Sequence, residues 1–262
     1  MRVYFISKKL ILRVLLLVFI ISTVVLLSVP YYNVAFNVFS STKEIPIYSV
    51  DTPKNIVSMT FDCAWGGEDI PKLLDILNSY NVKATFFMVG DWMAKYPEDV
   101  KLINKNGHDV ANHSHTHLDM TGLNEDKIKL EILNANKKIE ELTGNKNILF
   151  RAPFGAYNNL MVKTAKSMGI YMIQWDVDSL DWKDMGVEAI VSRVTNKVKN
   201  GSIILFHNDT KFTLDALPGV IEGLRNKGYE FVKLTDLFIK DNYYIDFEGR
   251  QHSLIKESGS ID

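Results

Sequence analysis

Strand-like and helix-like segments alternate along most of this chain, and this alternation limits the fold more than any other feature of the sequence. Apolar runs such as IVSMTFD at 56–62 are typical of buried strands, and a stretch with helical spacing follows, such as DIPKLLDILNSYN at 69–81. The predicted strands are 56–62, 84–90, 108–113, 147–150, 170–179, 202–209 and 229–234, and the predicted helices are 69–81, 92–107, 125–144, 158–169, 188–201 and 215–228. Repeated β-then-α units favour an α/β domain built on a parallel sheet or barrel, whose functional residues follow the strands.

The N-terminus carries a separate signal. Lys8, Lys9 and Arg13 precede an uncharged apolar run at 14–29, which approaches the roughly 20 residues that a membrane-spanning helix needs. We expect an anchor, because no small-x-small cleavage site follows; a cleaved signal peptide, which would leave a secreted protein, is the alternative. Basic residues before the run indicate a single-pass cell-membrane protein with a cytoplasmic N-terminus and an extracytoplasmic domain.

Composition and hydropathy together divide the chain into parts. These are a cytoplasmic basic N-terminus at 1–13, a transmembrane anchor or signal segment at 14–29, a stalk at 30–52, the β/α domain at 53–242 and a polar C-terminal tail at 243–262. We expect the tail to be loosely ordered after Gly249. The net charge of −1 implies no basic face, so nucleic acid is not expected as a partner.

Polar and titratable residues stand where the predicted strands end. They are Asp62, His113, His117, Arg151, Asp178, Asp181 and His207. Each alone has an ordinary explanation, such as a helix-capping or turn aspartate, a surface arginine or a core histidine. Their recurrence at the same end of one β/α domain instead indicates an active site.

The segment HSHTH at 113–117 suggests a metal site. If it turns helically, His113 and His117 face the same way and can share one metal ion, whereas His115 points elsewhere. Exposed histidines in a polar loop are the alternative interpretation. The position directly after a short predicted strand favours the metal.

Taken together, motifs in a fixed order resemble those of the polysaccharide deacetylases, carbohydrate esterase family four, with its NodB-homology domain. TFDCAWG, HSHTH, RAPFG, DSLDW and ILFH match the family patterns TFDDGP, H-[ST]-x-x-H, R-x-P-[YF]-G, D-x-x-D-W and L-x-x-H, over about 54–240. The resemblance implies an irregular (β/α) barrel of about seven strands, preceded here by the predicted transmembrane helix. It also implies a hydrolase that removes N-acetyl groups from the amino sugars of a cell-wall polysaccharide, with peptidoglycan as the substrate.

The resemblance assigns roles by position. Asp62 matches the catalytic base and His207 the general acid. His113 and His117 match the ligands of a divalent metal, zinc in the first place, with cobalt or manganese as alternatives. The remaining matches are an Arg151–Asp181 pair that fixes the charge state of the catalytic groups, a wall for the acetyl methyl formed by Trp182 and Ile204, and an oxyanion donor in the backbone N–H near Phe154.

Motif one departs from the family pattern. Cys63, the only cysteine, stands where the family has an aspartate as third metal ligand, and Ala64 and Trp65 replace Gly-Pro. A thiolate can bind zinc, so Cys63 is a candidate ligand; the alternative is a small buried residue behind the site. The TFD-x-x-WG variant resembles the sporulation-associated, PdaB-like branch of the family, which implies a substrate in the spore envelope.

Two further functions remain open beside the de-N-acetylase. Because Cys63 replaces a ligand, the protein is alternatively a catalytically silent or weakly active wall-binding protein that keeps the fold. Hydrolysis of an O-acetyl ester would use the same groups. Retention of the other motif residues favours the enzyme.

Overall fold

The computed structural model describes residues 8–39 and 43–255, which fall into two compact units divided between Lys43 and Glu44. Helix α1 (Lys8–Phe39) belongs to the first unit. Its 21-residue part Lys8–Ser28 is long and apolar enough to cross a membrane, with a mean hydropathy of 3.0 over an 18-residue window. The helix therefore extends beyond the predicted segment at both ends. Residues 1–7 of the expected cytoplasmic N-terminus and 40–42 of the expected stalk lie outside the described residues.

Parallel strands form the central sheet of the second unit, in the order β6-β5-β4-β3-β2-β8-β7. The strands are β2 (Ile56–Cys63), β3 (Thr85–Met88), β4 (Asp109–Asn112), β5 (Leu149–Phe150), β6 (Tyr171–Met172), β7 (Val177–Asp178) and β8 (Ile203–His207). A further short strand, β9 (Glu230–Phe231), pairs with the first two residues of β2. The predicted α/β class and the number of strands are confirmed.

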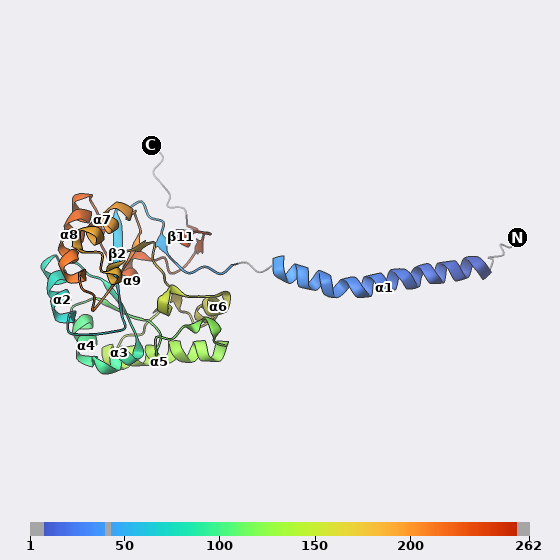
Figure 1. Cartoon of the computed structure of the whole chain (residues 1–262), viewed down its shortest axis with the longest axis horizontal. Coiled ribbons are helices and arrows are strands. Elements are labelled where there is room, and N and C mark those ends of the chain that lie inside the picture. The colour runs from blue at the N-terminus through green and yellow to red at the C-terminus, as the bar shows by residue number, and fades with distance from the viewer. Residues whose placement is uncertain (1–7, 40–42, 256–262) are drawn as a thin grey trace. The chain divides into compact units, whose positions relative to one another are not determined.

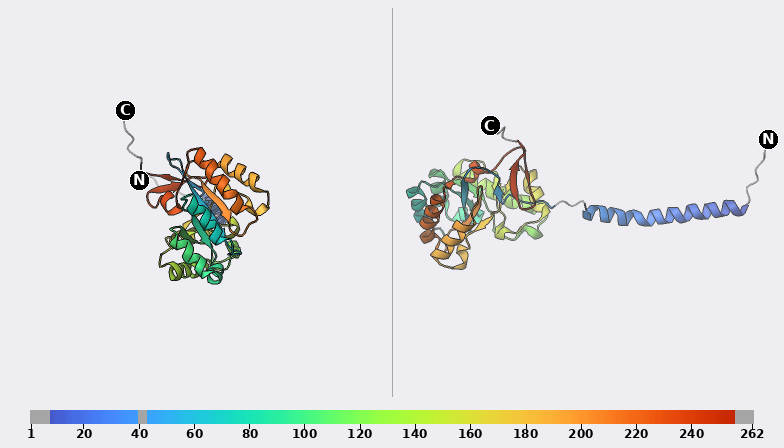
Figure 2. Two further views of the ribbon diagram at one scale, coloured as in Figure 1. Left: turned by 90° about the vertical axis from the view of Figure 1, so that its left-hand side faces the viewer. Right: turned by 90° about the horizontal axis from the view of Figure 1, so that it is seen from above.

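Helices cover the outside of this sheet (Figures 1 and 2). They are α2 (Ile70–Ser79), α3 (Gly90–Lys95), α4 (Pro97–Lys105), α5 (Glu125–Thr143), α6 (Asn159–Ser167), α7 (Val187–Lys197) and α8 (Thr213–Asn226). The short helix α9 (Leu234–Leu237) instead packs Leu234 and Leu237 against the interior core. Neighbours in the order α7-α8-α2-α4-α5-α6 contact one another, which follows the order of the strands they connect. The predicted helix 92–107 is two helices, because Pro97 starts a new one and leaves Tyr96 in a non-helical conformation.

The sheet curls until its two edges approach each other. The predicted strand 170–179 is wrong, because its residues form two short strands, β6 and β7, at opposite edges. Only residues 173–176 connect them, so the edges are a few residues apart. Ile47 fills the gap: its N–H donates to the Met172 carbonyl (2.9 Å) and its carbonyl accepts from the Gln174 N–H (2.7 Å). The result is the expected irregular, incompletely closed barrel.

Strand β2 separates the outer core from the barrel interior. Successive side chains of a strand point to opposite faces, and the residues that join the core under the helices are Val57, Met59, Phe61 and Cys63. Phe61 stacks on Phe86 and Phe206 there, with ring centroids 5.0 and 5.7 Å apart. Thr60 and Asp62 face the interior, where both contact Arg151.

A second, small sheet joins the start and the end of this unit. Its strands are β1 (Ser49–Val50), β11 (Arg250–Ser253) and β10 (Tyr243–Ile245), in that order. β11 runs parallel to β1 and antiparallel to β10. The buried Gln251 side chain exchanges two hydrogen bonds with the backbone of Ile239, at 2.8 and 2.6 Å. The expectation of a loose tail after Gly249 is therefore wrong for 250–253, while 256–262 lie outside the described residues.

Gly201 tests how tightly this sheet is docked. Its φ is +77°, and an added Cβ would collide with the carbonyl of Val50. Gly169 has a similar φ of +70° but open space around its Cβ position. We expect Gly169→Ala to lower the free energy of unfolding by about 1 kcal/mol through backbone strain alone. Gly201→Ala should cost at least about 1 kcal/mol more, as measured by urea denaturation of the full-length protein in detergent. Equal losses would contradict the close approach.

Candidate active site

The carboxyl ends of the strands bring most of the predicted site residues together. Asp62 is the last residue but one of β2, and its register partner His207 is the last residue of β8. His113 directly follows β4, and Arg151 directly follows β5. Parallel strands end at the same edge of a sheet, so these side chains meet at one rim of the barrel. The expectation that titratable residues cluster at strand ends is confirmed.

Arg151 and Asp62 form a buried ion pair at this rim. The Arg151 Nη1 lies 2.6 Å from Asp62 Oδ1 and 3.0 Å from Thr60 Oγ1, and Nη2 donates to the Gln174 carbonyl at 3.1 Å. Burial by itself would raise the pKa of Asp62, but the Arg151 guanidinium, together with nearby histidines, holds that pKa below its usual value. Asp62 is therefore a carboxylate at neutral pH.

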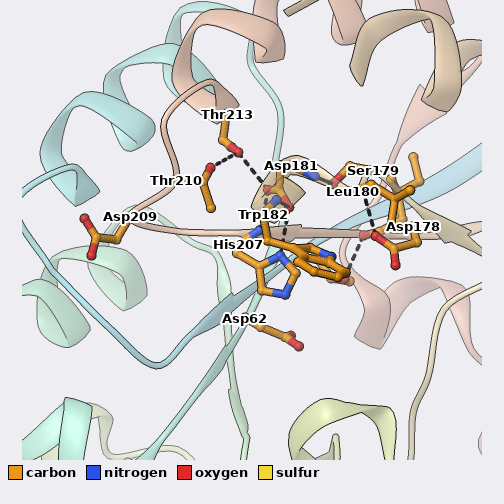
Figure 3. A network of polar contacts seen from close by, with 12 residues as sticks. Asp62, Asp178, Ser179, Leu180, Asp181, Trp182, His207, Asp209, Thr210 and Thr213 are labelled. Carbon is orange, nitrogen blue, oxygen red and sulfur yellow. Dashed lines mark hydrogen bonds and ion pairs between the residues drawn. The ribbon is translucent and has the colours of Figure 1, made fainter. Parts of the chain in front are cut away.

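The predicted pairing of Arg151 with Asp181 is wrong. Asp181 instead accepts from the His207 ring, with 2.8 Å between Oδ1 and Nδ1, and Oδ2 accepts from the His207 N–H at 2.7 Å. The Thr213 hydroxyl also donates to Oδ2 at 2.7 Å, so Asp181 is held from several sides (Figure 3). Arg151 follows the inner strand β5, and the Asp62 carboxylate neutralises it instead.

Asp181 sets the charge of His207. Burial would lower the pKa of His207, but the hydrogen bond and the negative charge of Asp181 raise it above the ordinary histidine value. The bond to Nδ1 also leaves Nε2 as the free nitrogen of the ring. The protonated form of His207 is thus favoured and can donate a proton, and its register partner Asp62 is a carboxylate that can accept one. Such a pair, with pKa values pushed apart, suits acid–base chemistry.

His113 has a defined tautomer. Its Nδ1 lies 2.9 Å from the carbonyl oxygen of Arg151, which can only accept, so Nδ1 carries the proton. Burial lowers the pKa of His113, so the ring is neutral and Nε2 keeps a lone pair. This nitrogen lies 3.5 Å from Asp62 Oδ2, another acceptor. The Nε2 lone pair of His113 is therefore available to a metal ion.

His117 lies beside His113, but not through a helical turn as expected. Ser114 and His117 adopt left-handed φ angles of 70° and 57°, and the Ser114 hydroxyl accepts from the His117 N–H at 3.0 Å. The two imidazole centroids are 5.0 Å apart. Burial, aided by His113, lowers the pKa of His117 to about 4, so this ring is also neutral and able to bind a metal. His115, which the helical turn would have pointed elsewhere, lies against Gly90 of α3.

Cys63 lies away from these histidines. Its side chain is fully buried in the outer core, because it follows Asp62 directly and so points to the opposite face of β2. Burial, with the nearby Asp69 carboxylate, raises the pKa of Cys63 well above the usual thiol value. Within the described residues, no three His, Cys, Asp or Glu side chains could hold a metal together. The donor set therefore fits a metal bound by two imidazoles, and Cys63 is not a third ligand here.

A cleft of about 820 Å³ opens above the rim. Trp182 and Phe154, two of the predicted substrate residues, line it together with His207 and Asp178. The third, Ile204, does not, because it is fully buried in the outer core. Ile204 and His207 are an odd number of residues apart on β8, so they face opposite sides, and Leu205 lines the cleft instead.

Several residues that hold the site gave no recognisable signal in the sequence. Glu131 of α5 accepts from the backbone N–H groups of His115 and Thr116, each at 2.9 Å, and so fastens the loop that carries the paired histidines. Trp175 lines the cleft and faces Arg151, with 5.4 Å between the guanidinium carbon and the ring centroid. A glutamate within a charged helix and a tryptophan near a strand end look ordinary until the tertiary structure brings them here.

Comparison with known proteins gives a consistent result. Residues 49–173 match the family model described as polysaccharide deacetylase. A peptidoglycan-N-acetylglucosamine deacetylase of Bacillus cereus is 35% identical over 195 residues, which cover 72% of this chain and 91% of that protein. The uncharacterized protein YlxY of Bacillus subtilis is 34% identical, and the match covers 73% of this chain but only 60% of YlxY.

Solved structures add a relative without activity. BA3943 of Bacillus anthracis, described as a pseudoenzyme of the CE4 family, has 35% sequence identity and a TM-score of 0.71, covering 79% of this chain and 72% of its own. A BA3943 mutant described as having restored enzymatic activity has 36% identity and the same TM-score of 0.71, with 74% and 71% covered. The match to almost the whole Bacillus cereus enzyme, on the same curled sheet, means that this chain belongs to the polysaccharide deacetylase family, the family 4 carbohydrate esterases.

Proposed function

We propose that this protein hydrolyses N-acetyl groups on the amino sugars of a cell-wall glycan, with peptidoglycan as its substrate. The observation that carries the proposal is the register pairing of Asp62 with His207, which sets a carboxylate of lowered pKa beside an imidazole of raised pKa. The substrate comes from the Bacillus cereus relative, which is named for deacetylation of N-acetylglucosamine in peptidoglycan.

The two groups suit the two proton transfers of amide hydrolysis. Asp62 is ionised and takes a proton from the attacking water. His207 donates a proton to the nitrogen of the departing amine, which is needed because an amide anion leaves poorly. Asp181 keeps His207 in the protonated state and fixes the ring through Nδ1. The aromatic cleft walls orient the sugar that carries the acetamide.

His113 and His117 are the residues that would hold a divalent metal. Both rings are neutral. Nδ1 of His113 donates a hydrogen bond to the Arg151 carbonyl, so its Nε2 keeps a lone pair that can bind a metal. A metal bound there, with zinc favoured by the imidazole ligands, would polarise the acetyl carbonyl and stabilise the oxyanion. With only two imidazole ligands from the described residues, we expect weak, exchangeable binding.

We also propose that α1 anchors the protein in the cell membrane. The segment Lys8–Ser28 has the length and hydropathy of a single span, and Lys8, Lys9 and Arg13 favour a cytoplasmic N-terminal side. The deacetylase unit would then face the wall outside the membrane. Cleavage after this segment would release a secreted enzyme, which mass spectrometry of the native protein would reveal.

A second function is favoured by Cys63. Its burial in the outer core leaves the metal with fewer protein ligands than the family pattern supplies. BA3943, a structural relative, is described as a pseudoenzyme whose mutant regains activity. On this hypothesis the protein binds wall glycan without hydrolysing it.

Acetate release separates the two functions. The full-length protein in mild detergent is chelated, resupplied with zinc, cobalt or manganese and incubated with purified peptidoglycan. We expect metal-dependent acetate release, and an Asp62→Asn variant should lose about a hundredfold or more in rate because the base is gone. Since this variant leaves Arg151 unpaired, circular dichroism must confirm its fold. A folded protein that releases no acetate with any metal supports the silent wall-binding function.

The role of Asp181 gives a pH-dependence with a definite sign. His207 acts in its protonated form, and the Asp181 charge extends that form to higher pH by raising the pKa of His207. In Asp181→Asn the pKa of His207 falls, so the alkaline limb of the kcat/KM profile should move to lower pH. Asp215→Asn, which removes an exposed carboxylate in the first turn of α8, is the matched control and should leave the limb unchanged. An unmoved limb in Asp181→Asn would exclude His207 as the acid.

Cys63→Asp tests the position of residue 63. A carboxylate in the outer core should lower the free energy of unfolding by about 3 kcal/mol or more, whereas Cys63→Ala should cost about 1 kcal/mol. Zinc affinity, measured by calorimetry, should not rise. A stable Cys63→Asp protein with at least about tenfold higher zinc affinity would show that residue 63 reaches the metal and would favour the silent function for the natural chain.

A further inference from the structure

Large aromatic side chains stand exposed around the cleft. Trp65, Phe154 and Trp182 line it and are 60%, 65% and 54% exposed. Aromatic surface left open in a concave site is typical of ligand binding rather than of stability. Phe154 and Trp182 lie in motifs that already carry a role. Trp65 replaces the proline of the family's first motif, and no role is attached to it.

Buried hydrogen bonds fix the backbone at Trp65, whereas most of its side chain is exposed. Trp92 Nε1 donates to the carbonyls of Trp65 (2.8 Å) and Gly66 (2.5 Å). Asn208 Nδ2 donates to the same two carbonyls, at 3.1 and 2.9 Å. Both donors are buried, one on α3 and one directly after β8. A ring presented by a fixed backbone loses little entropy when a ligand packs on it.

Trp65 also lies next to the reacting groups. Its ring meets the His117 imidazole edge-on, with centroids 5.1 Å apart, and Phe154 contacts the same imidazole at 4.7 Å. Trp182 follows Asp181 on the side of the cleft that holds His207. A glycan whose acetamide sits between His117 and His207 would therefore have a neighbouring sugar ring within reach of Trp65.

We propose that Trp65 forms a stacking subsite for an uncharged pyranose ring adjacent to the one being deacetylated. The C–H face of a pyranose is apolar and packs well on an indole. The cleft is lined by three carboxylates, of Asp178, Asp184 and Asp209, and by one lysine, Lys211. This excess of negative charge disfavours a sugar bearing its own carboxylate. The inference rests on the proposed function for the identity of the glycan, and it makes the protein selective for oligosaccharides over single sugars.

Binding measurements on the full-length protein in detergent test this subsite without turnover. The probes are the tetramer of N-acetylglucosamine and the single sugar, titrated by calorimetry with metals chelated. Trp65→Ala should weaken tetramer binding about tenfold, as loss of one stacking contact implies, and leave binding of the single sugar unchanged. Trp65→Phe, which keeps a flat ring, should recover most of the affinity. Phe247→Ala, a change at an aromatic residue that is 85% exposed and outside the cleft, should have no effect.

The outcomes separate this inference from the proposed function. Unchanged tetramer affinity in Trp65→Ala would overturn the subsite, and so would a folded natural protein that binds no tetramer. Trp65-dependent binding in a protein that releases no acetate would uphold the subsite and reject the deacetylase. An unchanged unfolding midpoint in Trp65→Ala, expected for an exposed side chain, excludes misfolding as the cause of lost binding.

Discussion

A buried guanidinium inside the curled sheet is the constraint on which the site depends. Moving such a charge out of water costs several kcal/mol unless it is paired and hydrogen-bonded. Arg151 is fully buried and meets this need with the Asp62 carboxylate, while the ring of Phe87 packs 4.0 Å from its guanidinium carbon. Asp62 is thereby kept ionised and fixed through Oδ1, and its Oδ2 is left facing His113. The Arg151–Asp62 ion pair thus stabilises the barrel interior and also keeps the proposed base, Asp62, ionised and in position.

The two faces of β2 explain why Asp62 of motif one reaches the active site and why Cys63, which replaces the family aspartate, does not. The interior face carries Asp62 to the rim, and the next residue, Cys63, must enter the apolar layer under the helices. In that layer a cysteine fits as a small apolar group. The family aspartate at this position would have to leave the strand geometry seen here to reach a metal.

Much of the fold could be predicted from sequence, because long amphipathic helices such as α5 and apolar strands such as β2 carry strong periodic patterns. The failures occurred where partners are distant. Residues 170–179 look like one strand, since nothing local shows that the chain crosses from one sheet edge to the other. The polar segment 250–253 hides its strand because it shows no apolar alternation and one of its two partner strands, 49–50, lies at the other end of the unit.

For the candidate site, too, local motifs were predictable and contacts between distant residues were not. Motif order located Asp62, His113, His117, Arg151, Asp181 and His207, and the family prediction is confirmed by the relatives. The partners of these residues were not predictable, because motif spacing does not say which carboxylate neutralises Arg151. Ile204 was misplaced for a simpler reason: strand alternation sends it and His207 to opposite faces.

The pairing of β1 with β11 limits how far the chain can fold while it is being synthesised. These strands are parallel and separated by nearly the whole unit, so their contact forms only after residues 250–253 have been synthesised. Until then β1 has no partner on that side, and the small sheet stays incomplete. Final closure of the small sheet therefore waits until residues 250–253 have been synthesised.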